Sequence, residues 1–282
     1  MTRCCAVYGY ECTRPASIGR FDLQPRYRTL SEAHEKARDK SKYHLTAVIV
    51  GDRIDDLLAF RLEAILSFIE HLDVIVTDPI EVGASNPFEA FPSTLPTHGR
   101  HDGGGATLME DMFIGNSRAK FIGACLEHLE DEARSARTRF GDLLFKKVET
   151  FRQRRPLVEV SYFLLYSGLE AHARAVTNDP SSRHSSSVPI TNLLVGYGFD
   201  VSVERPADLK RAMSTYTHLR NALFHNAQLE AEVNINGHIT VLKLRDYYVE
   251  LLLLVSLVVF KAVPFDDGHI NWNSWIDRQP FK

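Results

Sequence analysis

Residues 206–226 read PADLKRAMSTYTHLRNALFHN, and this stretch decides how the C-terminal half of the chain is interpreted. Pro206 is tolerated at a first helical position, and no later glycine or proline interrupts the stretch. Apolar side chains recur at spacings of four, three and four, namely Ala212, Tyr216, Leu219 and Leu223. The spacing therefore predicts one amphipathic helix over 206–226 with a buried apolar stripe.

A second stripe of the same helix is polar. Its members recur at spacings of three, four, three and four, namely Arg211, Ser214, His218, Asn221 and His225. Asn221 and His225 are i,i+4 neighbours and can touch, whereas Arg220 lies roughly 140° around the axis from His225 and must reach over. The polar stripe either meets solvent or lines a cleft.

The order Arg220-Asn221-x-x-x-His225, late in an apolar helical segment, resembles the signature of HEPN ribonucleases. The family pattern is looser, with Arg followed by His after four to six residues, and it occurs three more times, at Arg28/His34, Arg38/His44 and Arg211/His218. Only the match at 220–225 has Asn directly after Arg. The resemblance covers residues 110–282 and implies an all-α HEPN-like helical bundle for that part of the chain.

The resemblance also implies an activity. HEPN enzymes cleave RNA without a metal or cofactor, by attack of a 2′-hydroxyl on its own phosphate, and two domains pair so that two motifs face one cleft. On this basis His225 is expected as the general acid or base, Arg220 as the phosphate ligand, and Asn221 as a group that orients His225 or donates to the phosphate. RNA and a second copy of the chain are the expected partners. A toxin or antiphage defence role, with an antitoxin or regulatory partner, is typical of free-standing members.

A second helix is expected over 156–177. Because most of its faces are apolar, it is expected to lie at the centre of the bundle. Glu170 lies among apolar neighbours and needs a partner. Arg174, at i+4, offers a local ion pair. Alternatively, Glu170 or Tyr166 reaches the motif helix and orients Arg220 or His225. Glu170 and Tyr166, together with His218, are the expected supporting residues.

Two further features complete the C-terminal half. Residues 232–241 alternate around Asn236-Gly237, which predicts a β-hairpin directly after the motif helix. The apolar run 251–260 is too short to cross a bilayer and predicts a core helix or a dimer face.

Basic residues are frequent in 116–155, which has helical composition, but acidic residues are interleaved with them. These charged side chains either form a solvated helix face or bind RNA phosphates. The candidate RNA-binding residues are Arg152, Arg154, Arg155 and Arg211.

The N-terminal part predicts a small α/β domain over 1–82. Strands are expected at 5–11, 18–24, 45–50 and 74–77, and helices at 30–40 and 54–72. Residues 83–109 are rich in Gly, Pro, Ser and Thr and predict a linker or mobile loop. The complete chain is thus expected to be α+β. Specificity, sensing or dimerisation is the default role for the N-terminal domain.

Composition sets limits on function. The net charge of −3 for 282 residues argues against a general nucleic-acid coat and allows only a local basic site. Four cysteines without a CxxC pair support neither a zinc site nor a disulfide scaffold. The first residues lack the apolar core of a signal peptide, so a cytosolic protein without membrane contact is expected.

Two functional classes remain open. The first is a HEPN-like endoribonuclease, and the second is a non-catalytic HEPN-like module that binds RNA, a nucleotide or a protein. A weaker third alternative is a structural helical protein in which the motif is accidental.

Overall fold

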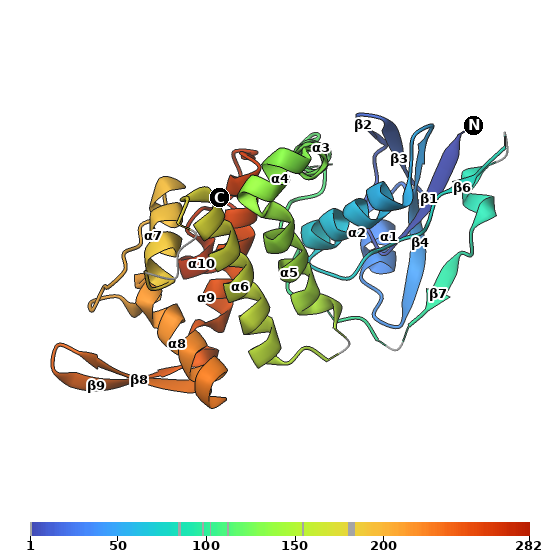
Figure 1. Cartoon of the computed structure of the whole chain (residues 1–282). Helices are drawn as coiled ribbons and strands as arrows, with labels where there is room; N and C mark the ends of the chain where they lie inside the picture. The colour runs from blue at the N-terminus through green and yellow to red at the C-terminus, as the bar shows by residue number, and fades with distance from the viewer. Residues whose placement is uncertain are drawn as a thin grey trace. The chain divides into compact units, whose positions relative to one another are not determined.

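The computed structural model describes residues 2–83, 86–97, 99–101, 103–111, 113–153, 155–179 and 184–282. It confirms the α+β class: an antiparallel sheet with helices is followed by a mainly helical part that carries a β-hairpin (Figure 1). The contacts divide the chain into two compact units, Met1–Glu130 with Phe151–Arg155, and Asp131–Thr150 with Pro156–Lys282. Within the described residues, no helix combines the length and the apolar character needed to cross a membrane.

The first unit is built on an antiparallel sheet of order β2-β3-β4-β1-β5, with β6 paired to β1 and β7 paired to β4. Its strands are β1 (Arg3–Tyr8), β2 (Ala16–Ile18), β3 (Phe21–Pro25), β4 (Lys42–Gly51), β5 (Ile75–Val76), β6 (Ile80–Glu81) and β7 (Thr94–Pro96). The helices are α1 (Leu30–Ala37), α2 (Asp56–Glu70), η1 (Pro87–Ala90) and α3 (Ser117–Glu130). The single strand expected over 18–24 is wrong, because the chain turns at Gly19 (φ 56°) and Ile18 pairs with Phe21.

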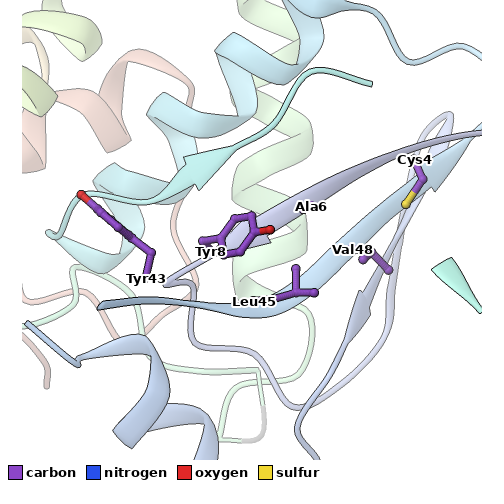
Figure 2. Packing of buried hydrophobic residues seen from close by; sticks show 6 residues of the cluster. All are labelled: Cys4, Ala6, Tyr8, Tyr43, Leu45 and Val48. Carbon is purple, nitrogen blue, oxygen red and sulfur yellow. The ribbon is translucent and has the colours of Figure 1, made fainter. Parts of the chain in front are cut away.

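One face of this sheet is covered by the segment that was expected to be a linker. Cys4, Ala6 and Tyr8 of β1 lie on that face with side chains of β4 (Figure 2). Phe88, Phe91 and Leu95 pack against this cluster, and β7 adds a strand beside β4. The expected boundary at 83–109 therefore differs from the observed division after Glu130: its apolar residues are too widely spaced to show a period, yet they cover the sheet.

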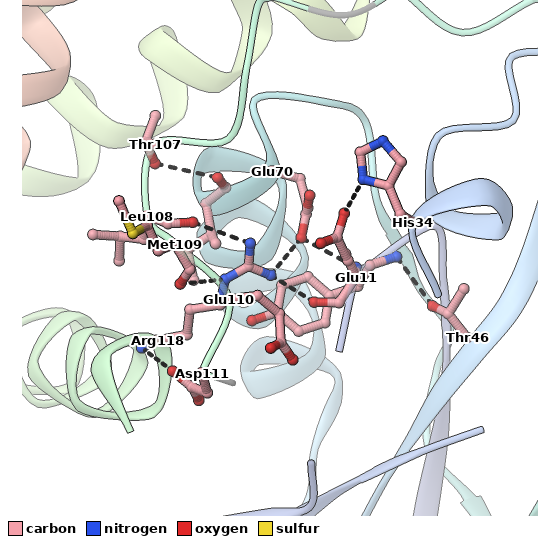
Figure 3. Close-up of polar contacts among 12 residues, drawn as sticks. Glu11, His34, Thr46, Glu70, Thr107, Leu108, Met109, Glu110, Asp111 and Arg118 are labelled. Carbon is pink, nitrogen blue, oxygen red and sulfur yellow. Dashed lines mark hydrogen bonds and ion pairs between the residues drawn. The ribbon is translucent and has the colours of Figure 1, made fainter. Parts of the chain in front are cut away.

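A buried polar network holds the end of α2 in place (Figure 3). The Glu70 carboxylate is fully buried and accepts a hydrogen bond from Arg118 Nη1 at 2.7 Å and from the Glu11 backbone N–H at 3.1 Å. Arg38 Nη2 lies 3.1 Å from its other oxygen. Arg118 also donates to the Leu108 carbonyl, so this one side chain connects α3, α2 and the preceding loop. Removal of Glu70 would leave the buried Arg118 guanidinium without the carboxylate that pairs with it.

The second unit contains seven α-helices, one 3-10 helix and the hairpin among its described residues. They are α4 (Glu132–Thr138), α5 (Phe140–Arg152, which ends in the first unit), α6 (Val158–Val176), α7 (Ser187–Gly196), η2 (Leu209–Arg211), α8 (Met213–Asn226), β8 (Glu230–Ile235), β9 (His238–Lys243), α9 (Leu244–Ala262) and α10 (Ser274–Asp277). α6 packs against α4, α7, α8 and α9, which confirms its central place. The apolar run 251–260 lies in α9, whose residues are mostly buried.

The motif helix is shorter than expected. Ala212 is extended (φ −92°, ψ 113°) and bridges Ser202, so the helix α8 begins at Met213 and not at Pro206. The Met213 and Ser214 N–H groups donate to the carbonyls of Ser202 and Val203 at 2.9 and 3.0 Å. These contacts with an upstream segment satisfy the first donors of the helix and set its start.

The predicted hairpin is confirmed. Asn236 (φ 52°) and Gly237 (φ 86°) form its turn between β8 and β9. Two consecutive positive φ angles are what a two-residue type I′ turn requires, and Asn-Gly provides them at low cost. The hairpin extends from the C-terminal end of α8 and packs against that helix (Figure 1).

The Glu70 network generates a stability prediction. Glu70→Ala strands Arg118 inside the first unit and should lower the free energy of unfolding by about 3–5 kcal/mol. Chemical denaturation followed by circular dichroism measures this. The matched control is Glu130→Ala, which removes an exposed ion pair with Arg20 and should cost less than about 1 kcal/mol. Equal losses in the two variants would contradict the structural role of Glu70.

Candidate functional site

Arg220 is held by α6. Its Nη2 lies 3.6 Å from Glu170 Oε2, and Glu170 Oε1 accepts a hydrogen bond from Arg174 Nε at 2.9 Å. Arg220 Nη1 donates to Asn221 Oδ1 at 2.9 Å. Both alternatives for Glu170 therefore occur together: it makes the local pair with Arg174 and also reaches the motif helix. The Arg220 side chain remains 31 % exposed, so an outside anion can still approach the guanidinium.

Two aromatic rings flank the same guanidinium. Arg220 Cζ lies 5.7 Å from the Tyr166 ring centroid and 5.5 Å from that of Phe224. The Tyr166 hydroxyl is buried and hydrogen-bonded to Ser186 Oγ at 2.7 Å and to Thr217 Oγ1 at 2.8 Å. Burial raises the pKa of Tyr166, although these two hydrogen bonds oppose the rise. Tyr166 is therefore a neutral, fixed surface behind Arg220.

His225 occupies a different side of α8. It is exposed and lines a groove of about 750 Å³ between α8 and the hairpin. The groove is lined by His218, Asn221, Ala222, His225, Asn226, Gln228, Leu229, Glu230, Ala231, Glu232 and Val241. Arg220 does not line it. Among the described residues, no hydrogen bond or ion pair joins His225 to another side chain.

Asn221 links the two sides. Its side-chain oxygen accepts from Arg220, while the residue also lines the groove that contains His225. The bond fixes the amide so that its NH₂ group remains as a donor for a ligand in the groove. His218 lines the same groove two turns before His225. Three members of the predicted polar stripe, His218, Asn221 and His225, thus lie on one wall of the groove, and the hairpin forms the other; Arg211 precedes α8 and does not line it.

Two of the four candidate RNA-binding arginines, Arg152 and Arg211, are paired with carboxylates. Arg152 pairs with Glu63 and with Asp73 at 2.9 Å, all within the first unit. Arg211 lies 3.1 Å from Asp200 and 3.3 Å from Asp208. Their ion pairs weaken attraction for phosphate.

The other two candidates differ from these. Arg155 is exposed, and Arg154 lies outside the described residues. The described residues also contain no group of three or more His, Cys, Asp or Glu placed to bind one metal ion.

The residues that sequence reasoning missed come from the hairpin wall. Glu230 and Glu232 alternate along β8, and both line the groove opposite His225. Their period of two on a predicted strand was the available signal. Lys243 lies 3.4 Å from Glu230, whereas Glu232 makes no hydrogen bond or ion pair among the described residues.

Comparisons of the chain with protein-family models, with curated proteins and with solved structures found no match. The functional assignment of the groove therefore depends on its residues and on the resemblance of the motif at 220–225.

The support behind Arg220 generates a second stability prediction. Tyr166→Phe removes a hydroxyl that joins α6 to Ser186 and to Thr217 of α8, and should cost about 1–3 kcal/mol in the free energy of unfolding. The control is Tyr247→Phe: Tyr247 is half-buried, and its hydroxyl makes no hydrogen bond among the described residues. Thermal or urea unfolding compares the two. An unchanged Tyr166→Phe protein would show that this hydroxyl does not hold α8.

Proposed function

We propose that the chain is a metal-independent endoribonuclease that cleaves RNA by 2′-hydroxyl attack at a site shared by two copies of the chain. The observation that carries the proposal is the arrangement on α8, where Arg220 is bound to Asn221 and backed by Glu170 while His225 lies open in a groove. A guanidinium, an amide and an imidazole are the groups that such a reaction uses.

Each of the three residues has a role that fits its surroundings. His225 exchanges protons with the 2′-hydroxyl or the leaving 5′-oxygen, because an imidazole can both donate and accept a proton and the side chain is open to a substrate. Arg220 binds the scissile phosphate and stabilises the charge that develops on it. Asn221 donates its amide hydrogens in the groove. Glu170 positions Arg220, and His218 contributes a second imidazole to the same wall.

The geometry favours a composite site. Arg220 faces Glu170 and Tyr166 of α6, whereas His225 faces the hairpin, so one copy does not direct both side chains at the same point. A second copy that approaches this end of α8 supplies the complementary group. HEPN-like pairing across a two-fold axis therefore suits the arrangement.

An apolar patch next to Arg220 supports the same pairing. It consists of Leu157, Val160, Phe163 and Phe224, whose exposed fractions are 61, 38, 38 and 48 %. The Phe163 and Phe224 rings lie 4.5 Å apart, so α6 and α8 share this patch. Contiguous exposed apolar side chains mark interaction sites. A second copy is the partner that the composite site requires.

Toxin or antiphage defence in the cytosol is the biological setting we propose, with an antitoxin or regulatory partner that restrains cleavage. An unrestrained ribonuclease harms its own cell, so a restraining partner follows from the activity. The groove and the apolar patch are the surfaces that such a partner would cover.

A non-catalytic module that binds RNA, a nucleotide or a protein is the second candidate. The observation that favours it is that the Glu170 carboxylate lies 3.6 Å from Arg220 Nη2 and offsets the positive charge that would act on a phosphate. In that case binding survives His225→Ala, and the wild-type chain forms no cleavage products.

The catalytic roles predict loss of cleavage. Wild-type protein should cut RNA in EDTA, and Arg220→Ala and His225→Ala should each slow it by about 10²-fold or more, since general acid–base groups contribute that much. Gel analysis of labelled RNA measures the rate. Matched controls are Arg245→Ala and His238→Ala, two exposed side chains outside the groove, which should cleave normally. Folded motif variants that retain full activity would refute the proposal.

The composite site predicts that pairing and cleavage fail together. Phe224→Glu places a charge in the apolar patch and should shift the protein from dimer to monomer in analytical ultracentrifugation, with loss of cleavage. Val195→Glu, an equally exposed apolar position on α7, is the control and should remain dimeric and active. A Phe224→Glu protein that is monomeric yet fully active would contradict a shared site.

A further inference from the structure

A second hollow continues the groove along α8 and β8. It measures about 350 Å³ and is lined by Glu204, Pro206, Leu209, Ser214, Thr215, His218, Glu232, Val233, Asn234, Ile235 and Leu242. His218 and Glu232 line both this hollow and the groove that contains His225. These two residues therefore form the divide between neighbouring compartments of one cleft.

The lining of the second hollow suits a nucleobase and not a phosphate. Apolar side chains supply much of its wall, namely Pro206, Leu209, Val233, Ile235 and Leu242. Small-molecule sites combine such walls with a few polar groups that select the ligand. Two carboxylates, Glu204 and Glu232, repel an anion from the same space. A phosphate belongs near Arg220, which lines neither hollow, and the adjoining base belongs here.

The two carboxylates differ in their availability. Glu204 Oε2 accepts a hydrogen bond from Ser214 Oγ at 2.9 Å. Glu232 is exposed and makes no hydrogen bond or ion pair among the described residues. An ionised carboxylate only accepts hydrogen bonds, so a ligand that replaces water at Glu232 must offer it a donor. Carboxylates accept from the amino group of cytosine in just this way.

We propose that the second hollow is a base-binding subsite beside the scissile phosphate, and that Glu232 makes it select a base with an exocyclic amino group over uracil. Uracil presents a carbonyl oxygen where cytosine has its amino group, and that oxygen repels the carboxylate. The inference rests on the proposed function for the identity of the ligand as RNA. It adds a substrate preference that the Arg-Asn-x-x-x-His motif does not specify.

The test compares short oligocytidine and oligouridine strands, which differ at the pyrimidine edge. Fluorescence anisotropy with the full chain carrying His225→Ala, to prevent cleavage, measures both affinities. Oligocytidine should bind at least about fivefold more tightly. Adding Glu232→Gln should bring the two affinities within about twofold, because an amide offers both a donor and an acceptor.

Glu230→Gln is the matched control. It makes the same change on the same strand at a residue that lines only the first groove, so the preference should remain. Equal binding of the two strands, no binding of either, or an unchanged preference after Glu232→Gln would overturn the subsite. Cleavage by wild-type protein without base preference would contradict the subsite but would be consistent with the ribonuclease proposal. Cytidine-selective binding without cleavage would support the subsite and contradict the ribonuclease proposal.

Discussion

The setting of α8 against α6 is the constraint on which the proposed site depends. Three polar contacts fix it: Tyr162 Oη donates to the Tyr216 carbonyl at 2.8 Å, Tyr166 bonds to Thr217, and Glu170 lies beside Arg220. Together they leave α8 little freedom to rotate about its axis. Arg220 is thereby directed at α6, and the stripe that ends in His225 is directed at the hairpin.

In and around the resulting cleft, basic side chains lie on α8 and acidic side chains lie on the hairpin. Arg220 lies on one side of α8, the imidazoles of His218 and His225 line the groove, and the carboxylates of Glu230 and Glu232 stand on the hairpin wall. A strand of RNA presents phosphates and bases alternately, so a cleft with both characters suits it better than a uniformly basic surface. The proposed RNA site is therefore compatible with a chain whose net charge is −3.

Short-range patterns in the sequence predicted the elements that are determined by residues close together in the chain. The spacing of Tyr216 and Leu219 predicted the buried face of α8, and Asn236-Gly237 predicted the hairpin. Long-range contacts controlled the rest. The helix α8 begins later than expected because Ala212 pairs with Ser202, and Arg152 finds partners 79 and 89 residues away in sequence. No periodicity reports such partners. The period of two could place Glu230 and Glu232 on one side of the predicted strand, but only the structure shows that both line the groove beside α8.

The chemistry of the RNA ends tests the central claim most directly. Attack by a 2′-hydroxyl breaks the bond from phosphorus to the 5′-oxygen and leaves a 2′,3′-cyclic phosphate on one fragment and a 5′-hydroxyl on the other. Mass spectrometry of fragments made by wild-type protein in EDTA should find these ends. Fragments that carry 3′-hydroxyl and 5′-phosphate ends, or the absence of any fragments, would contradict the account.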